Sequence, residues 1–203
     1  MTTAAAVVRR SRPALTAAER VALGIVGVAV AGFGLAGVRG GVPGTSQYLF
    51  TVVALTAGVA ALRRRPLPGA LAVAAAVSVV AHLAGGLVRV GDGVLYNASA
   101  GNEVLRYDHV AHALGIFVGT MLLWELLVRG TRAAAEAAPL VVLALLAGLG
   151  LGALNETIEF LATQAHGGGE VGGYTNTGWD LVVNSLAGGA AGLVLLRRRG
   201  VPS

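Results

Sequence analysis

Long apolar runs dominate this sequence and leave the chain few ways to fold. Six segments approach or reach the length of about 20 residues that an α-helix needs to cross the hydrocarbon of a bilayer. They comprise residues 21–38, 45–62, 67–88, 108–128, 139–160 and 179–196. An α-helix bonds all of its backbone polar groups within one segment, as the lipid interior requires. The sequence therefore predicts an all-α, polytopic membrane bundle of about six transmembrane helices in a single integral membrane domain, residues 1–203.

The composition agrees with a membrane protein. Only 12% of the residues are charged, about half of what a soluble domain carries. The net charge of +5 does not indicate a nucleic-acid partner, because the arginines stand beside apolar runs, so we expect membrane lipids as the main partner. The absence of cysteine excludes disulfides, thiolate metal sites and cysteine nucleophiles. The first apolar run exceeds the length of a signal-peptide core, which favours an anchor.

The arginines are distributed unevenly between the two sides of the predicted bundle. One side holds only Arg39, Arg89 and Arg106. The other side holds Arg9, Arg10, Arg12, Arg20, Arg63, Arg64, Arg65, Arg129, Arg132, Arg197, Arg198 and Arg199. The positive-inside rule then predicts that both termini are cytoplasmic (N-in/C-in), with residues 1–20 forming a cytoplasmic segment.

Two long loops are predicted on the non-cytoplasmic side, residues 89–107 and 161–178. The second contains the glycine-rich stretch HGGGEVGGYTNTG. Such a stretch is typical either of a flexible linker or of a mobile lid over a site, and both interpretations remain open.

Polar residues gather at the outer ends of four predicted helices. The fourth helix begins with Asp108, His109 and His112, and the fifth ends with Asn155, Glu156 and Glu159. The sixth begins with Asp180 and Asn184, and the third carries His82 in its outer third. The inner halves hold almost no polar groups, with Glu125 as the exception.

The spacing of these residues predicts that they share a pocket. Counted from Asp108 on the fourth helix and from Asn155 on the fifth, the polar residues occupy positions 1, 2 and 5 of the segment. These three positions span an arc of about 100° on one helical face. An ionisable side chain at the centre of a membrane helix costs about 2.5–3.5 kcal/mol on insertion scales and normally faces the bundle interior or a water cavity. Each of the three helices that carry several of these polar residues, the fourth, fifth and sixth, also contains a GxxxG pair, a pattern that allows close helix packing. The pairs are Gly115/Gly119, Gly148/Gly152 and Gly188/Gly192.

Simpler interpretations exist for several of these residues taken singly. Asp108 and Asp180 each stand near a predicted helix start, where Asp is a favourable N-cap. His109 is close to the membrane interface, His82 has the setting of a satisfied packing residue, and Tyr96 has that of an interfacial anchor. His112 and the pair of glutamates lie too deep in an apolar helix for such explanations.

Three stretches resemble a known family. YDHVAHALG, NETIEF and WDLVVNSLAGGAAG, within residues 107–192, resemble the uncharacterised bacterial membrane family typified by YjdF and, more distantly, the VanZ-like proteins. His109 and Glu159 stand where VanZ-like proteins tend to have Lys and Gln, so the YjdF type is the closer match. The resemblance implies a multi-pass protein of the bacterial cytoplasmic membrane. It points to Asp108, His112, Glu156, Glu159, Asp180 and Asn184 as site residues.

The residue types favour a metal-assisted enzyme acting on a lipid, a lipid-linked cell-envelope intermediate or another amphiphile. Carboxylates and imidazoles suit zinc, iron or manganese, and a spare glutamate provides a general base. The predicted metal ligands are Asp108, His109, His112, Glu159 and Asp180. Glu156 and Glu159 are the predicted catalytic residues, and Asn155, Asn184 and His82 support them.

Two other functions are compatible with the same residues. In a non-catalytic assembly subunit the polar groups pair with one another, although each membrane hydrogen bond contributes only about 0.6 kcal/mol. In a proton-coupled transporter the histidines and carboxylates form a proton relay, but the inner half of the bundle offers almost no polar path.

Overall fold

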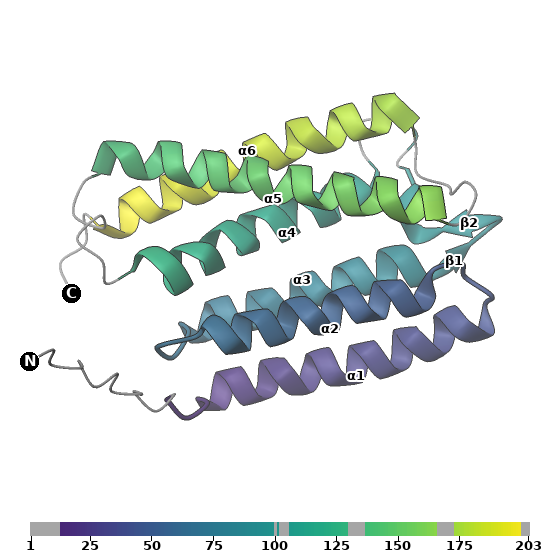
Figure 1. The fold of residues 1–203 in the computed structure, drawn as a ribbon, viewed down its shortest axis with the longest axis horizontal. Helices are drawn as coiled ribbons and strands as arrows, with labels where there is room; N and C mark the ends of the chain where they lie inside the picture. The colour runs from purple at the N-terminus through teal and green to yellow at the C-terminus, as the bar shows by residue number, and fades with distance from the viewer. Residues whose placement is uncertain (1–12, 100, 102–105, 130–136, 166–172, 200–203) are drawn as a thin grey trace, which may run out of the picture.

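Six long helices follow one another along the chain, as the apolar runs predict (Figure 1). The computed structural model describes residues 13–99, 101, 106–129, 137–165 and 173–199. The helices are α1 (Ala17–Arg39), α2 (Thr45–Leu62), α3 (Gly69–Leu87), α4 (Tyr107–Leu123), α5 (Ala137–Ala165) and α6 (Gly173–Arg199). Helix α4 continues into a π-helical turn, η2 (Trp124–Val128). All six are long and apolar enough to span a membrane, which confirms the predicted fold class.

A short hairpin and a helical turn separate α3 from α4. Strands β1 (Arg89–Val90) and β2 (Gly93–Val94) pair antiparallel, and the 3₁₀ turn η1 (Leu95–Asn97) follows directly. Gly91 adopts a φ of +59° in the hairpin turn, a left-handed conformation that favours glycine. The described first part of the loop predicted between the third and fourth helices, residues 89–99, therefore contains regular structure, and it places Tyr96 against the end of α3.

The helices form two groups of three that meet at α3 and α4 (Figure 1). In the first group, Ala29 of α1 and Val52 of α2 pack with Leu83 and Leu87 of α3. A second apolar cluster joins α3 to the other group through Leu71, Val118, Met121, Ala144, Ala191 and Leu195. Helix α3 thus contributes to both cores.

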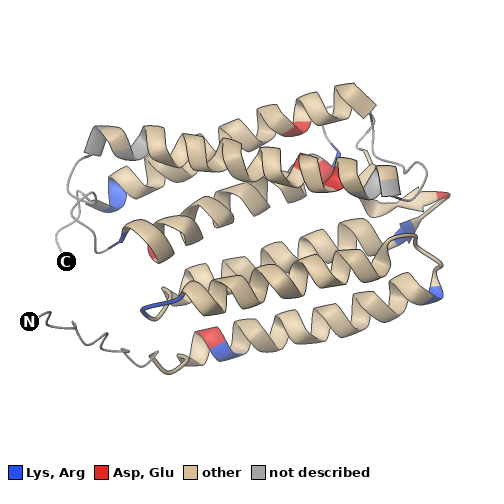
Figure 2. Cartoon of the chain, viewed as in Figure 1, with Lys and Arg blue, Asp and Glu red and all other residues tan. Residues whose placement is uncertain are grey.

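The outer faces of the bundle are apolar, as lipid contact requires. Large side chains such as Val28, Phe50 and Leu186 are exposed. Charged residues lie toward the ends of the helices and leave long uncharged stretches between them (Figure 2). A surface of this kind is stable in hydrocarbon and unfavourable in water.

The helix boundaries differ from the expected ones mainly around the glycine-rich segment. Helix α5 runs to Ala165, and α6 begins at Gly173 rather than at residue 179, so the prediction of a loop over residues 161–178 is wrong at both of its ends. Gly, Thr and Asn have low intrinsic helix propensity, but here the first turns of α6 pack against α4 through Asn176. Residues 166–172, on which the lid interpretation depends, lie outside the described part of the chain, as do residues 1–12 of the predicted cytoplasmic segment.

The GxxxG pattern corresponds to a close helix crossing at α5 and α6. A Cβ built on Gly148 would lie 2.7 Å from the Cα of Gly188. Other glycines of the pattern instead make room for side chains: Gly115 for His82, and Gly152 for Asn184. The glycines therefore allow α5 and α6 to pack closely, and they also leave space for two polar residues of the predicted site, His82 and Asn184.

Candidate metal centre

The predicted polar residues converge at one end of the bundle, where α4 and α6 begin and α5 ends. We call this the site end. Helix α4 contributes Asp108 and His109 and, one turn later, His112. Helix α6 contributes Asp180 and Asn184, which have the same four-residue spacing as Asp108 and His112. Helix α5 contributes Asn155, Glu156 and Glu159.

His112 lies at the centre of this group, and oxygen atoms of other side chains lie close to both of its ring nitrogens. Its Nε2 is 3.3 Å from Asp108 Oδ1 and 3.6 Å from Glu159 Oε1. Its Nδ1 is 3.3 Å from Asn184 Oδ1 and 3.7 Å from Glu156 Oε1. One imidazole therefore contacts side chains from all three helices, as the spacing of the polar residues predicts.

Asp180 and His109 form a second contact beside the first. His109 Nε2 lies 3.7 Å from Asp180 Oδ1, and both side chains are buried. His109 is thus part of the cluster instead of facing water at the membrane interface.

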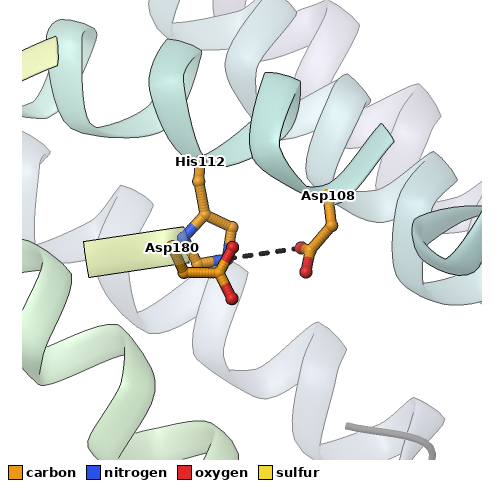
Figure 3. Close-up of side chains that lie close together, drawn as sticks. All are labelled: Asp108, His112 and Asp180. Carbon is orange, nitrogen blue, oxygen red and sulfur yellow. Dashed lines mark ion pairs between the residues drawn. The ribbon is translucent and has the colours of Figure 1, made fainter. Parts of the chain in front are cut away.

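Two sets of donor atoms lie close enough together to hold a cation. Asp108, His112 and Asp180 offer one set (Figure 3), and His112, Glu156 and Glu159 offer another; within each set the ligand atoms are within 4.8 Å of one another. Figure 3 shows the carboxylates of Asp108 and Asp180 beside the His112 ring. A mixture of imidazole and carboxylate donors suits zinc, iron and manganese.

The charges of the cluster favour a cation. Four carboxylates, those of Asp108, Glu156, Glu159 and Asp180, surround the two histidines. Asp180 Oδ1 and Glu156 Oε1 are buried and have no hydrogen-bond donor among the described residues. Buried carboxylate oxygens are costly without a compensating partner, and a bound cation would compensate them.

The side chains of the cluster differ in how accessible they are. Asp180 is 0% exposed and the His112 side chain is 2% exposed, whereas the Glu159 side chain is 29% exposed. Asn155 Nδ2 donates a hydrogen bond of 2.6 Å to Glu159 Oε1. Glu159 is therefore the carboxylate most open to an incoming molecule, and Asn155 orients it.

His82 joins the site from the first group of helices. Its ring stacks on that of His112 with centroids 6.4 Å apart and an interplanar angle of 26°, and Gly115 leaves the space that it occupies. The predicted supporting residue thus lies beside the central histidine, with the two rings stacked.

Tyrosines lie behind His82. Tyr96 packs edge-on against its ring, and Gly85 leaves room for Tyr96, so Tyr96 packs against α3, a contact that the prediction of an interfacial anchor did not include. The hydroxyl groups of Tyr96 and Tyr48 share a hydrogen bond, and Tyr48 also donates to His82 O at 3.1 Å. Burial raises the pKa of Tyr96 well above its ordinary value, and Tyr48 raises it further.

The N-cap interpretation of the two aspartates is wrong. Arg106 occupies the N-cap position of α4 and Asp108 lies within the first turn. Asp180 lies almost two turns inside α6, which begins at Gly173. Both carboxylates are consequently free to face the cluster.

Two residues of the site are absent from the sequence-based set. Asn176 bonds both Asp108 and Asp180, and Arg106 bonds Asn176. Asn176, Asp180 and Asn184 recur every four residues and so share one helical face, but this signal is visible only if the helix is extended through the glycine-rich segment. Arg106 carried no signal beyond its position before the helix.

Comparison with known families places the chain in one of them. The model of a family described as "Predicted membrane protein (DUF2238)" matches residues 18–200. The chain belongs to this family, which agrees with a multi-pass membrane protein carrying six candidate spans. The narrower resemblance to YjdF-type and VanZ-like proteins stays a prediction. Neither the curated proteins nor the solved structures contained a match.

Proposed function

We propose that this member of the DUF2238 family is a metal-dependent membrane enzyme that acts on a lipid or lipid-linked cell-envelope substrate. One observation carries the proposal: a buried histidine, His112, lies among four carboxylates supplied by three apolar helices. A buried group with this excess of negative charge is unfavourable unless its carboxylates take up protons or a cation binds to it.

The ligands that we propose are Asp108, His112 and Asp180, with His109 and Glu159 beside them. Their donor atoms are oxygen and imidazole nitrogen, the set that zinc, iron and manganese accept. A divalent cation held there supplies polarisation of a substrate oxygen and activation of water.

The two glutamates of α5 have the position of catalytic bases. Glu159 is the most accessible carboxylate, and Asn155 holds one of its oxygens at 2.6 Å. A carboxylate fixed in this way accepts a proton from water or from a substrate hydroxyl group. Glu156 lies on the other side of the His112 ring, 3.7 Å from Nδ1, and either binds the cation or takes part in the same proton transfer.

The surroundings of the site favour an amphiphilic substrate. The cluster lies within three candidate spans, and Ile158 and Phe160, beside Glu159 on α5, are exposed apolar residues. A substrate with a hydrocarbon tail can remain in lipid while its polar head reaches Glu159. The arginine distribution places the site end on the side of the membrane that faces away from the cytoplasm. Cell-envelope intermediates are processed on that side.

One observation favours a second function, a non-catalytic assembly subunit. The hydrogen bonds between Asn176, Asp108 and Asp180 join α4 to α6, so the polar groups also hold helices together. In that case the cluster would stabilise the bundle without binding a metal.

Elemental analysis of the purified full-length protein separates the two functions. We expect stoichiometric zinc, iron or manganese in the wild type, and loss of the metal in folded His112→Ala and Glu159→Gln variants. Glu125→Gln is the matched control, because Glu125 lies in the π-helical turn after α4, at the opposite end of the bundle, and pairs with Arg129. A metal-free wild type, together with a His112→Ala variant that unfolds, would favour the assembly subunit and overturn the enzyme proposal.

A further inference from the structure

Asn176 occupies a bridging position between two of the proposed ligands. It lies one turn before Asp180 on α6 and is only 6% exposed. Its Nδ2 donates to Asp108 Oδ2 at 3.1 Å and to Asp180 Oδ2 at 2.7 Å. Both hydrogens of one amide thus bind carboxylates from two different helices.

Arg106 determines which way this amide points. Its Nη1 donates a hydrogen bond of 2.8 Å to Asn176 Oδ1. A guanidinium group has donors and no acceptor, so the amide oxygen must face Arg106 and the amide nitrogen must face the two carboxylates. The reverse orientation would place the oxygen against two acidic groups and the nitrogen against a cation.

In Asp108 and in Asp180, one carboxylate oxygen therefore accepts a hydrogen bond from Asn176, and the other oxygen is left to bind a different partner. The Oδ2 atoms of Asp108 and Asp180 accept from Asn176. The Oδ1 atoms face the histidines: Asp108 Oδ1 is 3.3 Å from His112 Nε2, and Asp180 Oδ1 is 3.7 Å from His109 Nε2. The available oxygens thus lie on the side of the imidazoles.

We infer that Asn176 is a positioning residue that presents the Oδ1 atoms of Asp108 and Asp180 to a divalent cation. This inference rests on the proposed function, because it assigns Asn176 a role at the same metal centre. Groups that hydrogen-bond to metal ligands orient them, and their loss typically weakens metal binding about 10- to 100-fold. Arg106 acts one step further out by orienting Asn176.

The test measures binding of Zn²⁺ to the purified full-length protein by competition with a chelator. The variants are Asn176→Ala and, as the matched control, Thr175→Ala, an exposed neighbour on the same turn. We expect Asn176→Ala to bind Zn²⁺ about 10- to 100-fold more weakly than the wild type, and Thr175→Ala to bind as the wild type does. The visible spectrum of bound Co²⁺ should change in Asn176→Ala, because it reports the geometry of the ligand atoms.

Arg106→Met provides an independent variant if Asn176→Ala does not fold. Loss of a positive charge near the centre would by itself strengthen cation binding. Weaker Zn²⁺ binding in Arg106→Met therefore supports the orientation of Asn176, whereas tighter or unchanged binding overturns it.

The remaining outcomes separate this inference from the proposed function. If the wild type and Asn176→Ala bind Zn²⁺ equally and give the same Co²⁺ spectrum, Asn176 only tethers α6 to α4 and the inference fails alone. If the wild type binds neither ion and the purified protein also contains no iron or manganese, the proposed function fails and the inference fails with it.

Discussion

Glu19 and Arg63 form a buried ion pair at the end of the bundle opposite the site end. Arg63 Nη1 lies 3.0 Å from Glu19 Oε1, and the side chains of Arg63 and Glu19 are 8% and 4% exposed, respectively. Glu19 also accepts hydrogen bonds from the backbone N–H groups of Thr16 and Leu67. One carboxylate therefore ties the start of α1 to the chain on both sides of the turn between α2 and α3.

Loss of one partner of this pair should destabilise the protein. Arg63→Met leaves the Glu19 carboxylate buried without its cation, which typically costs about 3 kcal/mol or more. Unfolding of the purified protein by SDS titration measures the change, with Arg64→Met as the control because Arg64 is exposed. The double variant Glu19→Gln/Arg63→Met should lose less than the sum of the single variants; additive losses would show that the pair is not coupled.

The crossing of α5 and α6 should not tolerate a methyl group. Gly148→Ala places a Cβ 2.7 Å from Gly188 Cα, a backbone atom that cannot move aside without moving its helix. Overpacking of this kind typically costs about 1–3 kcal/mol. Gly150→Ala is the matched control on the same helix, since within the described part of the chain no atom beyond the neighbouring backbone of α5 would lie within 4 Å of its Cβ. This variant should be neutral or slightly stabilising. Equal stability of the two variants in the same SDS titration would contradict the close crossing.

Metal binding should stabilise the folded protein. A ligand that binds only the native state at 100 times its dissociation constant adds about 2.7 kcal/mol to the free energy of unfolding. We therefore expect added Zn²⁺ or Mn²⁺ to raise the midpoint of thermal unfolding of chelator-treated wild type. His112→Ala should show no rise. A rise of the same size in both proteins would locate the binding elsewhere in the chain.

Stability should fall at alkaline pH through Tyr96. The pKa of Tyr96 is raised in the folded state, so its contribution is complete below the unfolded value of about 10 and is lost as the pH rises through the folded value. Tyr96→Phe should lose about 1 kcal/mol at neutral pH with the hydrogen bond to Tyr48, and its stability should fall less steeply above about pH 10. Tyr174→Phe is the control, because Tyr174 is 95% exposed. Identical alkaline slopes for all three proteins would refute the assignment.

Apolar length predicts the helices well and their polar ends poorly. Helix α2 has the predicted bounds, residues 45–62, because its apolar run stops where Arg63 begins a turn. Helix α6 begins six residues before the predicted start, since the segment before residue 179 is polar and rich in glycine. Contacts with α4, such as Asn176 with Asp108, stabilise this turn, and no local pattern reports them.

The same distinction applies to the site. The i, i+4 spacing correctly predicts that Asp108 and His112 face Asp180 and the glutamates, because helical geometry determines which residues share a face. The stacking of His82 on His112 depends on how α3 packs against α4 and on the space left by Gly115. Contacts between residues of different helices are a property of the tertiary structure, so the spacing of residues along one helix cannot predict them.

All the proposed ligands come from the second group of helices, α4 to α6, and lie between Asp108 and Asp180 in the sequence. The first group, α1 to α3, contributes His82, which stacks on His112. If these residues hold a metal, the two halves of the chain should be under different evolutionary constraints. The lipid-facing positions of α1 and α2 can exchange one apolar residue for another over long periods of divergence. The polar face shared by α4, α5 and α6 can change only by coordinated substitution, so relatives should differ from this chain most in their first two helices.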